Sequence, residues 1–264
     1  MFKKIILAIL TFVLISCAGG KGENESTKKL ILGVSPIPHK EIVEFIKDDL
    51  ISEGIDLEIV VFNDYVQPNI SLNDGSIDAN YFQHIPYMES FGIENNIDMV
   101  SAGAIHLEPL KAYSNTVKSI EEIKEGSEVL IPNDPTNRGR ALLLLDASGL
   151  IKLNNRDKLD ARISDIVENP KKLVITSLNS EQIAPRLSEV TLAIINTNNA
   201  LASGITGDKA VIVEGKDSPY VNVIAVLRGK ENDEKIQKLV KVLQSDKVKK
   251  FITEKYNGEV EAGF

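Results

Sequence analysis

The sequence predicts an α/β fold divided into two lobes with a cleft between them. Short apolar runs alternate with segments whose apolar residues recur at helical spacing, and this alternation favours a mainly parallel sheet. Two such series follow one another, joined by extended segments. The 264 residues are 43% hydrophobic and 26% charged, which is ordinary for a soluble globular protein with one large domain or two small lobes.

The first series begins at residue 30. A strand predicted over residues 30–34 runs into a proline-rich turn, and residues 39–50 then place their apolar side chains on one helical face. Gly54 ends this helix, and residues 57–62 form the next strand. The pattern repeats around a turn at residues 73–75. This order of strand, turn and helix is that of βαβ units.

The second series lies beyond an extended segment at residues 100–114, whose interior Pro109 argues against a central strand. A short helix over residues 119–126 and a strand over 129–132 lead to a leucine-rich helix over 138–150. Further strands are predicted at residues 173–176, 192–196, 210–213 and 220–228, and a helix at 233–255. Ligands of open α/β sheets bind beyond the carboxyl ends of the strands, so we expect the ligand between the lobes.

The N-terminus has the pattern of an exported lipoprotein. Lys3 and Lys4 precede an apolar run over residues 5–15, which is too short for a good membrane-spanning helix. We therefore predict a signal peptide at residues 1–16, cleaved before Cys17, whose thiol would carry a lipid. The chain has one cysteine, so an internal disulfide is impossible. The alternative is a plain secretory signal with an incidental cysteine.

Residues 17–29 are predicted to form a flexible tether after the lipidated cysteine. They are mostly small and polar, and they cannot bury enough surface to fold. A tether between a lipid and a folded body implies that the body works close to a membrane surface without spanning it.

Charge and motifs narrow the classes of function. The formal net charge is −8, which argues against nucleic acid as a partner because phosphate binding needs basic patches. The sequence has no G-x-S-x-G, H-E-x-x-H, Walker or G-x-G-x-x-G motif. The three histidines lack metal-ligand spacing with the cysteine. We therefore expect no enzyme, no cofactor and no metal; a secreted hydrolase is the rival interpretation.

Residues 62–87 combine aromatic and polar side chains in an unusual density. Five of the 14 Phe and Tyr residues of the chain fall in this segment. Asparagine, aspartate, glutamine and histidine are interleaved with them. This mixture is typical of a small-molecule pocket with an apolar wall and a few placed polar groups. The alternative is an ordinary core strand followed by the start of a helix.

The same segment resembles a motif run of the methionine-binding lipoproteins that serve ABC importers, the MetQ/NlpA family. The matching patterns are FNDYV-PN at residues 62–69 and G-IDAN-FQH-PY at residues 75–87. Further matches are NDPTN-GR at 133–140, AIINT at 193–197 and KDSPYVN at 216–222. The resemblance therefore covers nearly the whole chain after the leader.

The resemblance implies the two-lobed type II periplasmic-binding-protein fold, in which the chain crosses between the lobes twice. We place the crossings near residues 109–114 and 220–225. Lobe 1 then comprises residues 30–110 plus 225–264, and lobe 2 comprises residues 111–224.

Arg140 is the first candidate for ligand binding. It lies near the predicted start of a helix, where unpaired N–H groups favour anions. Its guanidinium can grip a carboxylate with two hydrogen bonds. By spacing alone, a solvated arginine on the first helical turn is the simpler interpretation. The resemblance implies instead that Arg140 holds the carboxylate of an amino acid.

Asn196 and Asn222 are the second pair of candidates. Asn196 ends one predicted strand, and Asn222 lies at the start of the next long strand. A side-chain amide can accept from an ammonium or donate to a carboxylate. Ordinary turn or strand-end asparagines are the alternative. The resemblance implies that both residues line the pocket.

The side-chain pocket is assigned to Tyr65, Phe82, His84 and Tyr87. A thioether packs favourably against aromatic rings, and His84 could hydrogen-bond or simply pack as a core residue. Gln83 and Tyr113 are candidates of second rank. The role of His39, in the first turn between strand and helix, stays open.

The resemblance implies a lipid-anchored substrate-binding protein that captures methionine outside the cytoplasm and delivers it to an ABC permease and its ATPase. L-methionine is the first ligand to consider, with D-methionine and methionine-containing dipeptides as alternatives. A surface lipoprotein or antigen of the same fold without a transport role is the rival from another class.

Overall fold

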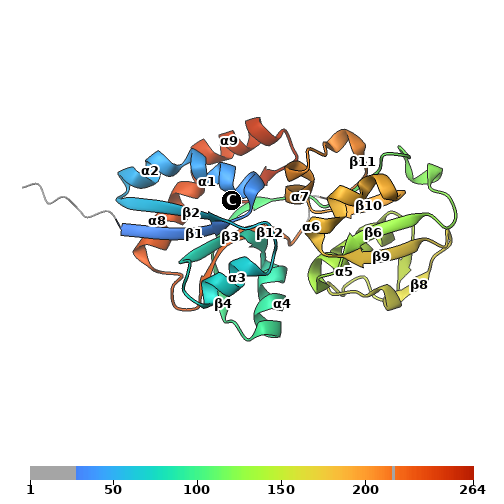
Figure 1. Cartoon of the computed structure of the whole chain (residues 1–264), viewed down its shortest axis with the longest axis horizontal. Coiled ribbons are helices and arrows are strands. Elements are labelled where there is room, and N and C mark those ends of the chain that lie inside the picture. Colours follow the sequence, from blue (N-terminus) through green and yellow to red (C-terminus); the bar gives the residue numbers. More distant parts are fainter. Residues whose placement is uncertain (1–27, 216–217) are drawn as a thin grey trace, which may run out of the picture.

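The first lobe is built on a six-stranded sheet. The computed structural model describes residues 28–215 and 218–264, and this sheet has the strand order β13-β4-β12-β3-β1-β2 (Figure 1). Its strands are β1 (Lys28–Val34), β2 (Ile55–Val61), β3 (Ala79–His84), β4 (Met99–Leu107), β12 (Val221–Leu227) and β13 (Glu261–Ala262). β1 pairs in parallel with β2 and β3, whereas β12 pairs antiparallel with β3 and β4. The lobe therefore takes strands from both ends of the described chain.

The second lobe has a five-stranded sheet with the order β11-β5-β10-β6-β9. Its strands are β5 (Lys111–Tyr113), β6 (Glu128–Pro132), β9 (Val174–Leu178), β10 (Leu192–Ile195) and β11 (Ala210–Val213). The parallel strands β9, β6 and β10 follow the predicted α/β pattern. A small hairpin of β7 (Lys152–Leu153) and β8 (Ile166–Glu168) stands apart from this sheet.

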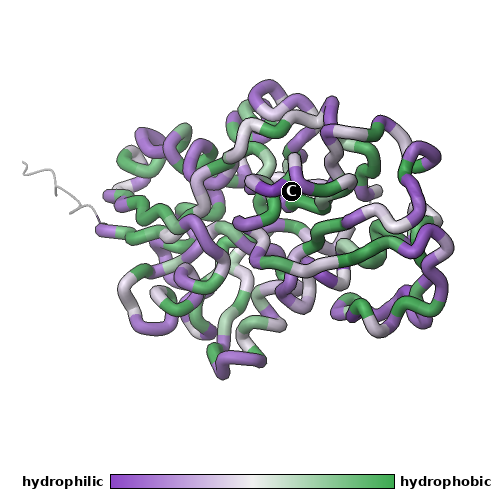
Figure 2. The backbone as a smooth tube through the Cα atoms, turned by 45° about the vertical axis from the view of Figure 1, so that its right-hand side comes forward, coloured by the Kyte–Doolittle hydropathy of each residue, from purple (hydrophilic) through white to green (hydrophobic). Residues whose placement is uncertain are grey.

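Helices cover both faces of the first sheet (Figure 1). One face carries α1 (Glu41–Phe45), α2 (Lys47–Ser52), α8 (Glu234–Leu243) and α9 (Asp246–Tyr256), and the other carries α3 (Gln67–Asn73) and α4 (Ile85–Asn95). The central strands β1 and β12 are largely buried, and the backbone tube in Figure 2 has green, hydrophobic stretches in the interior of the molecule. Burial of apolar side chains on both faces explains why these strands read as continuous runs rather than alternating ones.

The helix predicted over residues 233–255 is two helices. Ser245 lies between α8 and α9, and its side chain accepts a hydrogen bond from the backbone N–H of Val248. A serine in this position satisfies an otherwise unpaired donor of a new helix. The apolar residues of both helices still face the sheet, so the periodicity predicted the buried face correctly and missed the break.

In the second lobe, α5 (Pro135–Ala147) covers one face of the sheet, while α6 (Ser180–Ile183) and α7 (Thr197–Ala202) pack on the other. The side chain of Asp134 accepts from the backbone N–H of Asn137 and so caps α5. The short helix predicted over residues 119–126 is a single 3-10 turn, η2 (Ile120–Glu122).

The chain passes between the lobes from β4 to β5 and again from β11 to β12. The boundary predicted after residue 224 falls inside β12, because Val221 pairs with Leu107 and Asn222 with His106 of β4. The chain thus re-enters the first lobe at Val221, four residues before the predicted start of its second segment at residue 225. These strand pairs explain the difference, since the backbone at Val221 is already satisfied by the first lobe.

The tether predicted at residues 17–29 overlaps the first strand at its end. Lys28 and Lys29 belong to β1, where they pair with Ile55 and Asp56 of β2. The predicted signal peptide and Cys17 lie outside the described residues. Within the part of the chain that is described, no helix is long and apolar enough to cross a membrane.

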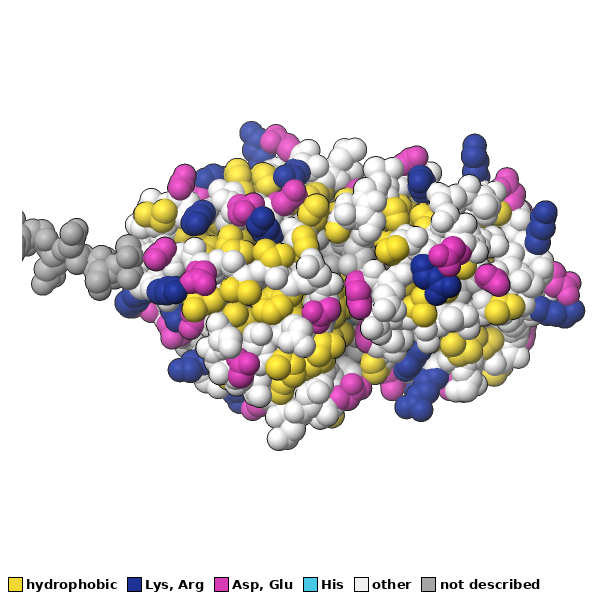
Figure 3. Space-filling model, viewed as in Figure 1, with side chains coloured by type: hydrophobic (Ala, Val, Ile, Leu, Met, Phe, Trp, Pro, Cys, Tyr) yellow, Lys and Arg dark blue, Asp and Glu magenta, His cyan; other side chains and the backbone are white. Residues whose placement is uncertain are grey.

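Charged side chains of both signs are mixed over the face seen in Figure 3, and hydrophobic side chains gather over the first lobe. A net charge of −8 gives the protein no overall positive field to steer nucleic acid toward it.

Gly139 on α5 offers a test of packing in the second lobe. A Cβ at this position would lie 1.9 Å from the carbonyl oxygen of Leu159 and 2.9 Å from the backbone nitrogen of Ala161. Since backbone must shift to relieve this contact, we expect Gly139→Ala to lower the free energy of unfolding by about 3 kcal/mol. Urea denaturation of this variant and of Gly215→Ala, whose Cβ meets no atom within 4 Å, checks the prediction. Equal stabilities of the two variants would contradict it.

Candidate functional site

Residues of both lobes line one small cavity between them. The first lobe and its edge contribute Tyr65, Phe82, Gln83, His84, Tyr87, Glu108 and Asn222, and the second contributes Asn137, Arg140, Asn196, Thr197 and Asn198. All seven residues to which the sequence assigned ligand binding border this cavity. Of the second-rank candidates, Gln83 also borders it, whereas Tyr113 packs in the core of the second lobe. The volume open to a water-sized probe is only about 20 Å³, close to what one water needs, so the lobes must separate to admit a larger ligand.

One end of the cavity is aromatic. The rings of Tyr65, Phe82 and Tyr87 form a triangle in which each pair of ring centroids is 6.0 Å apart. The Tyr87 hydroxyl donates to the backbone oxygen of Tyr65 at 2.7 Å, which turns the apolar part of the ring toward its neighbours. This end can hold an apolar, polarisable ligand group.

His84 joins the aromatic end to the polar end. It precedes α4, and its Nδ1 accepts from the backbone N–H of Tyr87 at 3.1 Å. The proton therefore lies on Nε2, which donates to Oδ1 of Asn137 at 3.2 Å across the cavity. Burial lowers the pKa of His84 to about 3, with a further contribution from Arg140. His84 is thus a neutral ring that bridges the two lobes.

The amides of Asn137 and Asn196 have defined orientations. Nδ2 of Asn137 donates to both carboxylate oxygens of Asp134 at 3.1 Å. Its Oδ1 is therefore the acceptor for Nδ2 of Asn196 at 2.8 Å. This leaves Oδ1 of Asn196 buried, with no hydrogen-bond partner among residues 28–215 and 218–264. A buried unpaired acceptor on a cavity wall is costly unless a ligand donates to it.

Arg140 is held differently from the prediction. Its Nε donates to Oε1 of Glu214 at 2.8 Å, its Nη2 also donates to Glu214, and Nη2 donates to the backbone oxygen of Glu108 at 2.7 Å. The ring of Tyr220 lies 4.2 Å from the guanidinium carbon. The two-bond grip that we expected for a ligand is thus made with Glu214. Nη1 takes no part in these bonds and is the nitrogen that a ligand can use.

A carboxylate of the protein itself stands at the start of α5, where the sequence predicted that the helix end would favour an anion. The carboxylate of Asp134 already accepts from the backbone N–H of Asn137 at 2.9 Å. Burial raises the pKa of Asp134, while its bonds to Asn137 and Thr136 lower it. The cap position of this helix is therefore already occupied.

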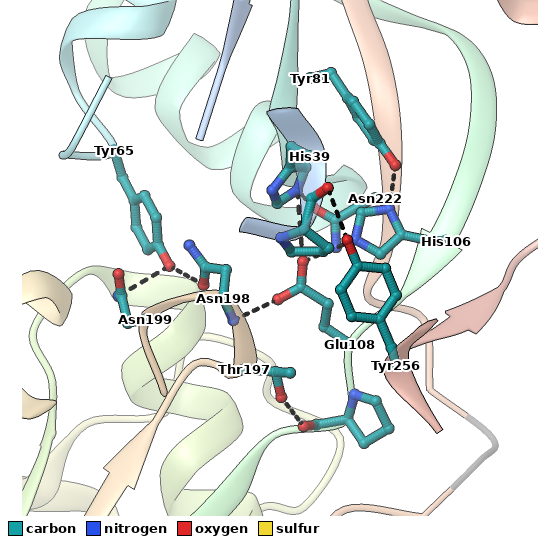
Figure 4. A network of polar contacts seen from close by, with 12 residues as sticks. His39, Tyr65, Tyr81, His106, Glu108, Thr197, Asn198, Asn199, Asn222 and Tyr256 are labelled. Carbon is teal, nitrogen blue, oxygen red and sulfur yellow. Dashed lines mark hydrogen bonds and ion pairs between the residues drawn. The ribbon is translucent and has the colours of Figure 1, made fainter. Parts of the chain in front are cut away.

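Glu108 is a buried carboxylate that the sequence did not single out. It follows β4, and its Oε1 accepts from Nε2 of His106 at 2.8 Å while Oε2 accepts from the backbone N–H of Asn198 at 2.8 Å. Burial raises the pKa of this carboxyl, but the bond to His106 and the nearby His39 outweigh it, so the pKa lies below its ordinary value. Glu108 is therefore an anion in the wall of the cavity, placed between two lobes (Figure 4).

Two histidines complete this network behind the cavity (Figure 4). The hydroxyl of Tyr81 bonds to Nδ1 of His106. Nε2 of His39 lies 3.1 Å from Oδ1 of Asn222 and 3.5 Å from Oε1 of Glu108. Burial lowers the pKa of His39 to about 4. Since His39 donates to Oδ1 of Asn222, the Nδ2 of that amide remains as a donor.

The ligand atoms of His39, His106 and Glu108 lie within 4.8 Å of one another, close enough to hold a metal ion. A metal would require both imidazole Nε2 atoms to lose their protons. The proton of His39 would then move to Nδ1, which has no hydrogen-bond partner in the described part of the chain. Hydrogen bonding thus explains the cluster better than metal ligation does.

A sequence profile of NlpA lipoproteins matches residues 30–264, nearly the whole of the described chain. The chain belongs to the NlpA lipoprotein family. It is 37% identical over 261 residues to the probable D-methionine-binding lipoprotein MetQ of Vibrio cholerae, covering 98% of this chain and 96% of that one. It is 36% identical over 271 residues to the methionine-binding lipoprotein MetQ of Bacillus subtilis, covering 98% and 97%.

Solved structures of NlpA-like proteins agree with this assignment. A nutrient-binding protein from Burkholderia cenocepacia, determined with bound methionine, superposes with a TM-score of 0.86 at 39% identity. The match covers 89% of this chain and 100% of that chain. The family prediction and the two-lobed binding-protein fold are thereby confirmed.

Four residues of the cavity wall escaped the sequence analysis. They are Glu108, Asn137, Thr197 and Asn198. Two of them, Asn137 and Thr197, lie inside motifs that the family resemblance had already marked, and Asn198 directly follows one of these motifs. Glu108 carried its own signal, because a lone charge between Leu107 and Pro109 interrupts an apolar extended segment.

Proposed function

We propose that this protein is a lipid-anchored substrate-binding protein that captures methionine outside the cytoplasm and delivers it to an ABC importer. The names of its relatives support methionine as the ligand. The observation that carries the proposal is the pairing, in one cavity, of an aromatic triangle with a polar end that offers both donors and acceptors. A zwitterion with an apolar tail matches both ends.

The ligand carboxylate is assigned to Arg140 and Asn222. Nη1 of Arg140 and Nδ2 of Asn222 are donors on the cavity wall whose neighbouring atoms are already bonded to protein groups. A charge-assisted bond from a guanidinium to a carboxylate contributes roughly 1.5–3 kcal/mol. Oδ1 of Asn196 is the acceptor for the ligand's amino group.

The thioether is assigned to the triangle of Tyr65, Phe82 and Tyr87. Contacts between a thioether sulfur and an aromatic ring are each worth about 0.3–1.5 kcal/mol. Norleucine, which has a methylene in place of the sulfur, is therefore expected to bind more weakly than methionine although it has nearly the same shape.

The lobes are expected to close on the ligand by a hinge motion, and the closed form would dock on the permease, which works with its ATPase. Cys17 would carry the lipid that keeps the protein at the membrane, facing the periplasm or the cell exterior. A surface lipoprotein without a transport role would keep the same fold but would not be stabilised by any amino acid.

A thermal-shift and calorimetric panel on the protein lacking residues 1–17 tests the proposal. Ligand carried through purification is first removed by unfolding and refolding. Methionine at about 100 times its Kd should stabilise the protein by about 2.7 kcal/mol, norleucine less, and glutamate and lysine not at all. A protein that no amino acid or methionine dipeptide stabilises would rule out the transport function.

The hydroxyl of Tyr65 provides a prediction about closure. It donates to Oδ1 of Asn198 at 2.6 Å and accepts from Nδ2 of Asn199 at 3.1 Å, and so it ties the first lobe to α7 of the second. Removing it costs about 1 kcal/mol of the closed state. We expect Tyr65→Phe to weaken methionine binding about fivefold, measured by titration calorimetry.

The same substitution at Tyr256 is the control. Its hydroxyl donates to Glu41 within the first lobe, so Tyr256→Phe should leave the methionine Kd unchanged while lowering stability. Equal changes of Kd in both variants would show that Tyr65 does not hold the lobes together.

A further inference from the structure

Three buried side-chain amides bond to one another near the aromatic end of the cavity. They belong to Asn69 of α3 and to Asn80 and Gln83 of β3, and none of these residues is more than 3% exposed. Nδ2 of Asn69 donates to Oε1 of Gln83 at 3.0 Å, and Oδ1 of Asn69 accepts from Nδ2 of Asn80 at 2.8 Å and from Nε2 of Gln83 at 2.7 Å. Nε2 of Gln83 also donates to Oδ1 of Asn80 at 2.9 Å. We call these three side chains the amide network.

The bonds of the amide network define the orientation of all three amides. Reversing any one of them would bring a donor against a donor or an acceptor against an acceptor. Both N–H groups of the Gln83 amide are engaged inside the network. Gln83, a second-rank candidate for ligand binding, therefore offers a ligand no donor although it borders the cavity. A fully bonded polar network in a protein interior fixes one arrangement of the elements that carry it.

The aromatic triangle takes rings from both elements that the amide network joins. Phe82 belongs to β3, whereas Tyr65 lies in the bend that leads into α3. Oδ1 of Asp64 accepts from the backbone N–H groups of Val66 and Gln67 at 2.7 and 2.8 Å, which ties this bend to the first residue of the helix. A shift of α3 along β3 would therefore change the separation of the Tyr65 and Phe82 rings, whose centroids are 6.0 Å apart.

The amide network supplies directional contacts that hold α3 in register with β3. Three of the seven residues of α3 are buried, namely Pro68, Asn69 and Leu72. Leu72 packs in the apolar cluster that includes Phe82, but hydrophobic contact is not directional and tolerates sliding. The hydrogen bonds of Asn69, and the bond from Nδ2 of Asn80 to the backbone oxygen of Pro68 at 3.3 Å, weaken steeply when their geometry changes.

From this arrangement we infer that the amide network sets the length of the ligand side chain that the aromatic triangle accepts. The inference rests on the proposed function and deepens it. Asn69 and Asn80 are positioning residues, because they act on the ligand through the rings of Tyr65 and Phe82. An apolar pocket of fixed depth distinguishes ligands that differ by one methylene by roughly 10- to 200-fold. A pocket whose wall can slide adapts to the longer ligand and loses this distinction.

Ethionine is the probe of side-chain length, because its S-ethyl group is one methylene longer than the S-methyl group of methionine. The two amino acids are otherwise identical, so their Kd ratio reports on the aromatic end of the cavity. Titration calorimetry on the unmodified protein should give a Kd for ethionine about 30-fold weaker than that for methionine. This measurement needs no variant and therefore does not depend on one folding.

Asn69→Leu removes the residue that bonds to both other amides and keeps a side chain of similar size. We expect the methionine Kd to weaken about tenfold and the ethionine Kd less than about threefold, so that their ratio falls below about 10. Asn80→Leu leaves the two bonds between Asn69 and Gln83 and should lower the ratio by a smaller factor, about twofold. If Asn69→Leu does not fold, Asn80→Leu decides in its place.

Asn169→Leu is the matched control. The amide of Asn169 bonds to the backbone N–H and backbone oxygen of Leu173 at 2.8 and 3.0 Å, in the second lobe and outside the cavity wall. This variant should melt at a lower temperature and leave both Kd values unchanged. A fall of the Kd ratio in Asn169→Leu would show that lost stability alone relaxes selectivity, and it would overturn the inference.

Two further results would overturn the inference while leaving methionine capture standing. One is an unmodified protein that binds ethionine and methionine within about threefold of each other, against the difference of at least about tenfold expected for one methylene. The other is a folded network variant whose Kd ratio equals that of the unmodified protein. A protein that binds neither amino acid overturns the proposed function itself.

Discussion

Arg140→Ala is expected to abolish methionine binding at concentrations at which the unmodified protein is saturated. The substitution removes the guanidinium of Arg140 from the cavity wall and with it the charge-assisted bond to the ligand carboxylate, worth roughly 1.5–3 kcal/mol. It also leaves Glu214 without its cation and Tyr220 without the group stacked on it. Together these losses should raise the Kd at least about 100-fold, measured by titration calorimetry.

Arg140→Ala is also expected to lower the free energy of unfolding, because Glu214 keeps its charge without its partner. Breaking a buried ion pair by removing one partner is costly because the other charge stays behind. The pair of substitutions Arg140→Gln and Glu214→Gln removes both charges. We expect the double variant to recover most of the unfolding free energy that Arg140→Gln loses, but not its affinity for methionine. Recovery of affinity in the double variant would remove Arg140 from the ligand site.

The elements that could be predicted from the sequence are those whose signal is local. Apolar runs marked β1, β6 and β10 because their residues are buried on both sides. A continuous apolar run can be recognised without an alternation of apolar and polar residues. β3 did not give this signal, since its six buried residues include three polar ones and its identity depends on pairing with β1 and β12.

The seven cavity residues were predicted through motifs, and the partners that orient them were not. Glu214 is 74 residues from Arg140, and Asn222 is 183 residues from His39. No spacing rule connects positions so far apart along the chain. The prediction for Arg140 suffered most. The sequence analysis expected a ligand carboxylate to accept two hydrogen bonds from it, but the carboxylate of Glu214 accepts them.

Glu108 shows the same limit from the other side. Its charge inside an apolar segment was visible in the sequence, yet its role depends on His106 two residues away and on Asn198 in the other lobe, 90 residues away. A buried carboxylate can only be interpreted once its donors are known, because burial and hydrogen bonding move its pKa in opposite directions.

The second large effect expected is a loss of stability in acid that originates in two buried histidines. Burial lowers the pKa of His39 to about 4 and that of His84 to about 3, against an ordinary value of 6.5. Between pH 6.5 and pH 4 the unfolded chain takes up protons that the folded protein does not. The stabilising contribution is therefore complete above pH 6.5 and is lost as the pH falls through this window.

The size of the effect follows from the width of the window. Each histidine contributes about 1.4 kcal/mol per pH unit once the pH is well below 6.5. For the two together, a fall from pH 7.5 to pH 4.5 should lower the free energy of unfolding by on the order of 5 kcal/mol. The lowered pKa of Glu108 acts in the same direction, with its contribution lost only below about pH 4.5.

Urea denaturation at pH 7.5, 6.5, 5.5 and 4.5, on protein freed of ligand, measures this dependence. The control is the double variant His39→Gln and His84→Asn, in which asparagine keeps the ability to cap α4. Because neither new side chain titrates, its stability should fall by less than half as much over the same range. If the two proteins lose stability equally, then groups other than these two histidines cause the acid sensitivity. The assignment of both rings as neutral in the folded protein would then be wrong.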